Sequence, residues 1–92
     1  MTASQKKKIL VAEDEVIAAL GMKDMLEMWG YGPVKIAGSG EEAVQLADEF
    51  DPDLLLMDVR LSGEMDGVEA ARKILSEKKY RLYLFPVIRK RI

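Results

Sequence analysis

Four short, mostly apolar runs occur along the chain. They are Ile9–Ala12, Val34–Ala37, Leu54–Met57 and Leu82–Phe85. Runs of this length, bounded by polar or turn residues, predict buried strands. Because the runs are continuous and do not alternate with polar residues, they favour a parallel sheet that is covered on both faces.

Helical periodicity separates the first two runs. Val16–Met28 carries apolar residues at three- and four-residue spacing, which predicts a helix with one stripe facing the core. Gly30 lies where a glycine would end that helix. The predicted stripe comprises Ala19, Met22, Leu26 and Trp29.

Two further helices are predicted by capping signals. Ser39 and Glu42 have the Ser-x-x-Glu spacing of a capping box, and Asp66 with Glu69 repeats that spacing later in the chain. Pro52 ends the first of these helices, because a helix rarely continues through proline. The predicted core-facing residues are Ala43, Val44, Leu46 and Ala47 in one helix, and Ala70, Ala71, Ile74 and Leu75 in the other.

The strands and helices alternate, which predicts an α/β fold with a doubly wound parallel sheet. The order is strand, helix, strand, helix, strand, helix, strand. Pro86 directly follows the last run and places it at an edge of the sheet, since proline cannot donate a ladder hydrogen bond. Ninety-two residues fit one small domain, so we assign residues 1–92 to a single domain.

Composition excludes several kinds of chemistry. The chain has no cysteine and no histidine, which removes disulfides, thiolate and imidazole metal ligands, and Ser-His-Asp or Cys-His catalysis. Its first residues lack the apolar core of a signal peptide, and no apolar segment is long enough to span a membrane. We therefore expect a cytoplasmic protein without membrane contact.

Charge is unevenly distributed. Residues 13–69 hold 15 Asp and Glu against 3 Lys and Arg, although the net charge of the whole chain is −2. Such an acidic middle disfavours nucleic-acid binding and favours a divalent cation.

Carboxylates follow two of the predicted strands at the point where each ends. Glu13 and Asp14 come after the first strand, and Asp58 directly follows Met57 within "PDLLLMDVRL". If these strands are neighbours, the three carboxylates meet at the edge of the sheet where open α/β folds bind ligands. An all-oxygen set predicts Mg²⁺ or Mn²⁺. The alternative for Asp14 alone is a helix N-cap.

Three segments together resemble the receiver domain of two-component response regulators: "KILVAEDE", "PDLLLMDVRL" and "GEMDGVEAARKI". The resemblance covers residues 7–77. It implies a flavodoxin-like fold, here incomplete, without a fifth strand and the last helices.

The resemblance also implies roles for individual residues. Asp58 matches the phosphoacceptor, Asp14 the direct metal ligand, and Glu13 a ligand acting through water. Arg60 lies where the family offers a backbone carbonyl to Mg²⁺, and Gly67 matches the glycine that closes the following loop. The implied partner is a sensor histidine kinase or a phosphotransfer protein, and the domain would not be an enzyme in its own right.

The C-terminal part departs from the family pattern. No Ser or Thr follows Ser76, and Lys90 has no preceding strand that would give it the role of the family's lysine. Ser62 stands where the family often has proline. We interpret residues 80–92 as a divergent basic and apolar tail of a truncated or altered domain, with impaired switching.

Three functional hypotheses follow. The first is a phosphorelay receiver module that accepts a phosphoryl group on Asp58. The second is an interaction domain that is not phosphorylated. The third is a haloacid-dehalogenase-like phosphatase, which Arg60 disfavours because that class has an aspartate at this position. We also expect a homo-oligomer, formed through the exposed sheet edge or a swapped C-terminal segment.

Overall fold

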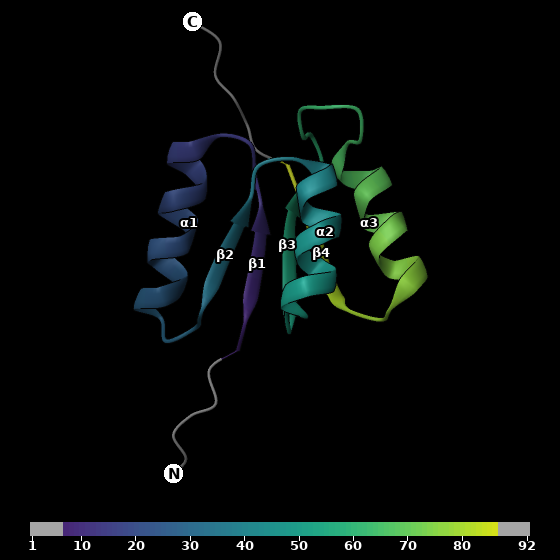
Figure 1. Cartoon of the computed structure of the whole chain (residues 1–92). Helices are drawn as coiled ribbons and strands as arrows, with labels where there is room; N and C mark the ends of the chain where they lie inside the picture. The colour runs from purple at the N-terminus through teal and green to yellow at the C-terminus, as the bar shows by residue number, and fades with distance from the viewer. Residues whose placement is uncertain (1–6, 87–92) are drawn as a thin grey trace, which may run out of the picture.

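A computed structural model describes residues 7–86 of the chain (Figure 1). The strands are β1 (Ile9–Ala12), β2 (Val34–Ala37), β3 (Leu54–Asp58) and β4 (Arg81–Phe85); the helices are α1 (Val16–Met28), α2 (Gly40–Phe50) and α3 (Gly67–Glu77). All seven predicted elements are confirmed, and no boundary of a predicted strand differs by more than one residue.

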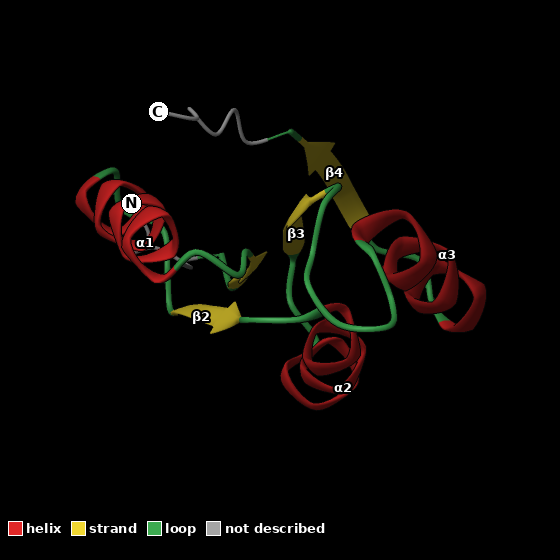
Figure 2. Ribbon diagram, turned by 90° about the horizontal axis from the view of Figure 1, so that it is seen from above, coloured by secondary structure: helices red, strands yellow, loops and turns green. Residues whose placement is uncertain are grey.

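The four strands form one parallel sheet in the order β2-β1-β3-β4. Seen from above, α1 lies alone on one side of the sheet, while α2 and α3 lie on the other (Figure 2). This arrangement confirms the flavodoxin-like doubly wound fold. It also confirms that β1 and β3 are neighbours and that β4 is the last strand of the sheet among the described residues.

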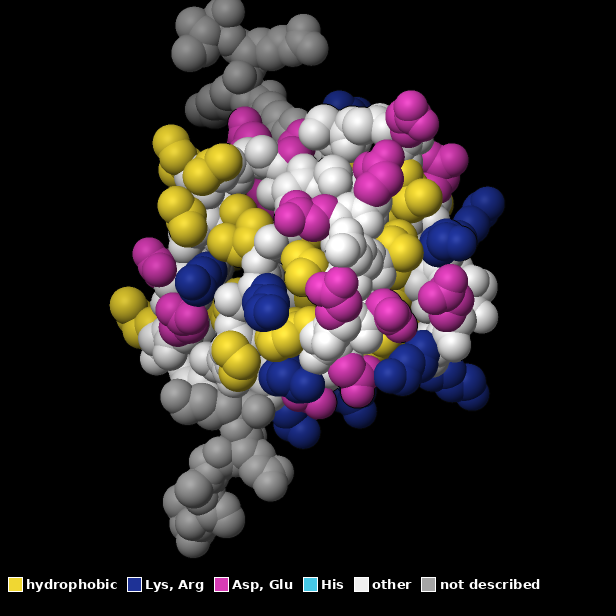
Figure 3. All heavy atoms as spheres, in the orientation of Figure 1, with side chains coloured by type: hydrophobic (Ala, Val, Ile, Leu, Met, Phe, Trp, Pro, Cys, Tyr) yellow, Lys and Arg dark blue, Asp and Glu magenta, His cyan; other side chains and the backbone are white. Residues whose placement is uncertain are grey.

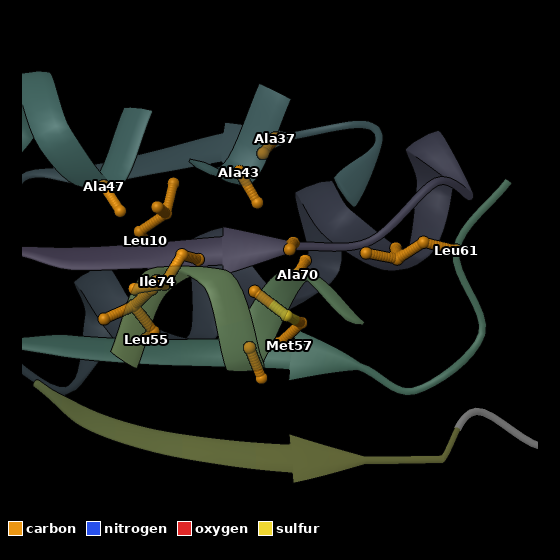
Figure 4. Close-up of a cluster of buried hydrophobic side chains, with 11 residues drawn as sticks. Leu10, Ala37, Ala43, Ala47, Leu55, Met57, Leu61, Ala70 and Ile74 are labelled. Atoms are coloured by element: carbon orange, nitrogen blue, oxygen red, sulfur yellow. The ribbon is translucent and has the colours of Figure 1, made fainter. Parts of the chain in front are cut away.

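Alternation along each strand divides the core into two layers, because successive side chains point to opposite faces. Ile9 and Val11 face α1, whereas Leu10 and Ala12 face α2 and α3. Figure 4 shows the larger layer, in which Leu10, Leu55, Met57 and Ile74 come together with alanines from the helices.

The helix ends bear out most of the capping predictions. Asp66 forms a complete capping box with Glu69 at the start of α3. Ser39 accepts a hydrogen bond from the Glu42 N–H at 3.1 Å, but the Glu42 carboxylate accepts from the Gly38 N–H and not from Ser39. The second predicted box is therefore a variant that reaches one residue further back.

Two predicted core residues are wrong. Trp29 is 64% exposed, because α1 ends at Met28 and the indole lies beyond the stripe that packs on the sheet. Leu75 is also exposed, since the buried arc of α3 is narrow and is filled by Ala70, Ala71 and Ile74. Within residues 7–86, no helix is long and apolar enough to cross a membrane.

Candidate functional site

The site lies where the central strands β1 and β3 end. Their parallel register pairs Ala12 with Met57, so the next residues, Glu13 after β1 and Asp58 at the end of β3, lie side by side at this edge. The backbone N–H of Glu13 donates to the Ala37 carbonyl at 2.9 Å and continues the β1–β2 ladder. The sheet thus fixes the backbone from which both carboxylates project.

Glu13, Asp14 and Asp58 form one cluster. Each offers an oxygen, and these oxygens all lie within 4.8 Å of one another. Glu13 is 1% exposed and Asp58 0%, whereas Asp14 is half-buried. The predicted convergence of the three carboxylates is therefore present in the fold.

Backbone donors orient the two buried carboxylates. Glu13 Oε2 accepts a hydrogen bond from the Glu15 N–H at 2.8 Å, at the start of α1. Asp58 Oδ1 accepts from the Arg60 N–H at 3.0 Å. Each acid is thus held by the backbone two residues after it, a local bond that its own loop supplies.

Burial raises the pKa of Glu13 from 4.5 to about 7. The Glu15 N–H opposes this rise, and the charge of Asp58 with hydrogen bonds to Asp14 and Asp58 reinforces it. A buried carboxylate beside other carboxylates is costly when ionised, and a cation among them removes that cost.

The donor set fits a hard divalent ion. Three carboxylates on one edge suit Mg²⁺ or Mn²⁺, which prefer oxygen ligands and keep some of their water. The exposed Arg60 contributes its N–H to Asp58. The role of its carbonyl as a ligand stays a prediction.

The β3–α3 loop closes tightly against the site. The Gly67 N–H donates to the Val59 carbonyl at 3.1 Å, and a Cβ at Gly67 would overlap the carbonyl oxygen of Asp58. Only glycine fits this approach, and Asp66 caps α3 beside it.

Glu41 also holds the β3–α3 loop, a contact that was not predicted from the sequence. Its carboxylate accepts a hydrogen bond from the Glu64 N–H at 3.2 Å. The two residues are 23 positions apart, so no local spacing could have indicated the contact.

The predicted tail residue Lys90 lies outside the described residues.

Comparisons with known proteins identify the family. The model of the response regulator receiver domain matches residues 9–88. Transcriptional regulatory protein PdtaR of Mycobacterium tuberculosis is 41% identical over 76 residues, covering 83% of this chain and 37% of PdtaR. Response regulator GacA of Pseudomonas syringae is 42% identical over 69 residues, covering 74% of this chain and 32% of GacA. The chain thus spans about a third of the length of these relatives.

Solved structures agree. The signal receiver domain of a modulated diguanylate cyclase from Desulfovibrio desulfuricans superposes with a TM-score of 0.82 at 32% identity, covering 91% of this chain and 67% of that one. Anti-anti-sigma factor PhyR of Bartonella quintana, in complex with anti-sigma factor NepR, gives 0.76 at 28% identity, covering 84% and 32%. On its sequence, its sheet order and the acidic edge of that sheet, the chain belongs to the response regulator receiver domain family.

Proposed function

We propose that this chain is a phosphorelay receiver that accepts a phosphoryl group on Asp58. The observation that carries the proposal is the convergence of Glu13, Asp14 and Asp58 at one edge of the sheet. The donor would be a phosphohistidine on a sensor histidine kinase or a phosphotransfer protein, in the cytoplasm. A carboxylate oxygen of Asp58 would form the new bond to phosphorus while the bond from phosphorus to the histidine nitrogen breaks.

The residues of the site have different proposed roles. Glu13, Asp14 and Asp58, with the Arg60 carbonyl, would hold Mg²⁺ or Mn²⁺, which neutralises the charge on the phosphoryl oxygens when bound. The Arg60 N–H orients the Asp58 carboxylate through its Oδ1. Gly67 lets the loop close on the Asp58 backbone.

Access to Asp58 requires movement. Its side chain is completely buried in this structure, so a donor reaches it only when neighbouring side chains or the β3–α3 loop shift. The loop is held at Glu64 by one exposed hydrogen bond, which the Glu64 N–H donates to the Glu41 carboxylate, and such a contact is readily broken. We therefore propose that phosphorylation is accompanied by opening of this loop.

Relay of the signal is proposed to be weak in the 92-residue chain. None of its residues after Ser76 is a Ser or Thr that would bind the phosphoryl oxygens. A receiver-like interaction domain that is not phosphorylated is the second candidate. It is supported by the burial of Asp58 and by the solved complex of the similar PhyR with NepR.

The test is incorporation of phosphate from a small acyl-phosphate donor in the presence of Mg²⁺, followed by intact-mass analysis. We expect one acid-labile phosphoryl group on the native chain and none on Asp58→Asn. Asp53→Asn is the matched control, because Asp53 is exposed at the opposite end of β3 and should not affect incorporation. Equal labelling of Asp58→Asn, or no labelling of a folded native chain, would exclude the proposal and favour the second candidate.

Self-association is also part of the proposal. Strand β4 has a neighbour on one side only among the described residues, and an unpaired strand edge favours pairing with another chain. The alternative of a swapped segment over residues 80–92 concerns positions 87–92, which lie outside the described residues.

A further inference from the structure

Helix α1 is apolar on nearly every side. Between Val16 and Met28 its only charged residues are Lys23, Asp24 and Glu27, and α2 and α3 are far more polar on their outer faces. A helix that is apolar all round is normally buried all round. Six of the eleven large apolar side chains that the described residues leave exposed lie on α1 or its C-cap: Val16, Ile17, Leu20, Met25, Met28 and Trp29.

The outermost line of α1 is apolar except for one carboxylate, that of Asp24. Ile17, Gly21, Asp24 and Met28 lie on the side opposite the buried Ala19, given 3.6 residues per turn. Ile17 is 87% exposed and Met28 81%, and nothing lies within 4 Å of the position where Gly21 would carry a Cβ. In Figure 3, yellow side chains gather on the left, over α1.

A second uncovered apolar surface lies on the same side of the sheet. α1 packs on β1 and β2, and no other described helix lies on this face (Figure 2). Over β3 and β4 the face carries Leu54 and Leu56, both half-buried, and Tyr83, which is 60% exposed. An open cleft at the start of these strands is lined by Lys7, Ile9, Tyr31, Asp53, Leu54, Arg81 and Tyr83.

We infer that these two surfaces bind each other in a dimer of this chain. The outer face of α1 in one copy would cover the open half of the sheet, over β3 and β4, in the partner, and the partner's α1 would do the same in return. Such reciprocal contact follows from a two-fold axis parallel to the strands, which makes the interface isologous. Both helices then lie side by side in one layer between two sheets. The inference rests on the proposed self-association and assigns it to this face, not to the β4 edge.

Charge complementarity supports a second copy of this chain as the molecule that covers the open half of the sheet. In this arrangement the C-terminal half of α1 lies over the start of the partner's β3 and β4, where the cleft is lined by two bases, Lys7 and Arg81, and one acid, Asp53. Asp24 lies on the outer line of α1, and the last turn of the helix has no basic residue to balance its negative dipole. Asp24 and the negative end of the helix dipole in one copy therefore meet a cleft in the partner that carries two bases against one acid.

Sedimentation of the 92-residue chain from low to high micromolar concentration tests the inference. We expect a species of twice the 10.3 kDa chain mass. Ile17→Glu and Tyr83→Glu should each weaken the dimer at least about tenfold, since each buries an unpaired charge. Leu75→Glu on α3 and Leu84→Glu on β4 are matched controls, because both side chains are exposed on the opposite side of the sheet and should leave the dimer unchanged.

A charge exchange provides a second measurement with exposed residues only. Asp24→Lys and Arg81→Glu should each weaken the homodimer by about three- to tenfold, and an equimolar mixture should restore association because both interfaces of the mixed dimer are then complementary. A monomeric native chain would overturn the inference together with self-association. A dimer that Leu84→Glu disrupts as strongly as Tyr83→Glu would favour the β4 edge. A mixture that stays dissociated would exclude the assigned orientation.

Discussion

Gly67 is the residue on which the closure of the site most directly depends. It opens α3, and its lack of a side chain lets the helix start against the backbone of Asp58. A methyl group there would collide with a carbonyl oxygen of the central strand, which cannot move without disturbing the sheet. The requirement for glycine at position 67 is therefore steric.

Gly67→Ala should destabilise the fold by roughly 2 kcal/mol or more, because overpacking against backbone is not relieved by side-chain rotation. Chemical denaturation measured by circular dichroism gives the free energy of unfolding. Gly38→Ala is the control, since a Cβ at Gly38 would make only an ordinary contact of 3.6 Å with Glu42, and we expect a change within about 0.5 kcal/mol. Equal effects of the two substitutions would show that steric exclusion at Gly67 is not the cause.

Glu13 gives the site a pH dependence. Its pKa is about 7 in the folded chain and 4.5 as the ordinary value, so the folded state holds its proton more tightly. Stability without metal should fall as pH rises from about 4.5 to 7, by a few kcal/mol at most. Stabilisation by Mg²⁺ should be larger at pH 8 than at pH 5.5, because the ion binds the ionised form. Thermal unfolding with and without Mg²⁺ at both pH values checks this, and Glu13→Gln should flatten both trends; a Gln variant with the native pH profile would assign them elsewhere.

The residues that carry the site could be predicted from the sequence, but not all of their surroundings. Acids at the ends of two strands identified Glu13, Asp14 and Asp58, because parallel strands end at the same edge. The hydrogen bond from the Glu64 N–H to the Glu41 carboxylate could not be predicted, since it joins the first turn of α2 to the β3–α3 loop with no periodic or local signal. The complete burial of Asp58 also depends on how the loops close, which no pattern of residue types specifies.

At the scale of the elements, the three helices begin in different ways. α3 starts with a reciprocal capping box and α2 with the Ser39 hydroxyl, whereas Glu15 precedes α1 without a side-chain cap. Capping therefore stabilises the two helices whose first turns lie near the β3–α3 loop, and packing stabilises α1.

Asp66→Ala should cost about 1–2 kcal/mol and Ser39→Ala about 0.5–1 kcal/mol, because Asp66 accepts from the Glu69 N–H through a charged carboxylate at the positive end of the helix dipole, whereas Ser39 accepts through a neutral hydroxyl. Urea denaturation of both variants gives the comparison. If Ser39→Ala proves the more damaging, the charge of the Asp66 cap adds nothing. Hydrogen exchange should also show faster opening of the amides at the start of α3 in Asp66→Ala only.

Element positions could be predicted well, but the width of each buried face could not. The periodicity placed Trp29 and Leu75 in the core because it counts apolar residues at helical spacing. Periodicity contains no information on the packing partners: α1 packs on only two strands, and alanines let α3 approach the sheet closely. The exposure of Trp29 and Leu75 is therefore determined by which elements pack against their helices.

At the scale of the whole molecule, charge and hydrophobicity are distributed along different directions. Three carboxylates cluster where the strands end, whereas the bases Lys7, Lys8 and Arg81 lie where the strands begin, together with Asp53. Apolar exposure is instead concentrated on the α1 side of the sheet. The proposed phosphoacceptor edge and the inferred dimer face are therefore separate surfaces, and both Asp58 sites of the inferred dimer would lie at the same end.

The sheet order has a consequence for synthesis. β1 is made first but lies between β2 and β3, and its partner residue Leu54 follows Ile9 by 45 positions (54 − 9). At about 5–20 residues per second, a ribosome needs several seconds to cover that interval. Until then, the four-residue apolar strand β1 has at most one of its two neighbouring strands. A stalled or prematurely released product would therefore expose an aggregation-prone segment to chaperones and to other nascent chains.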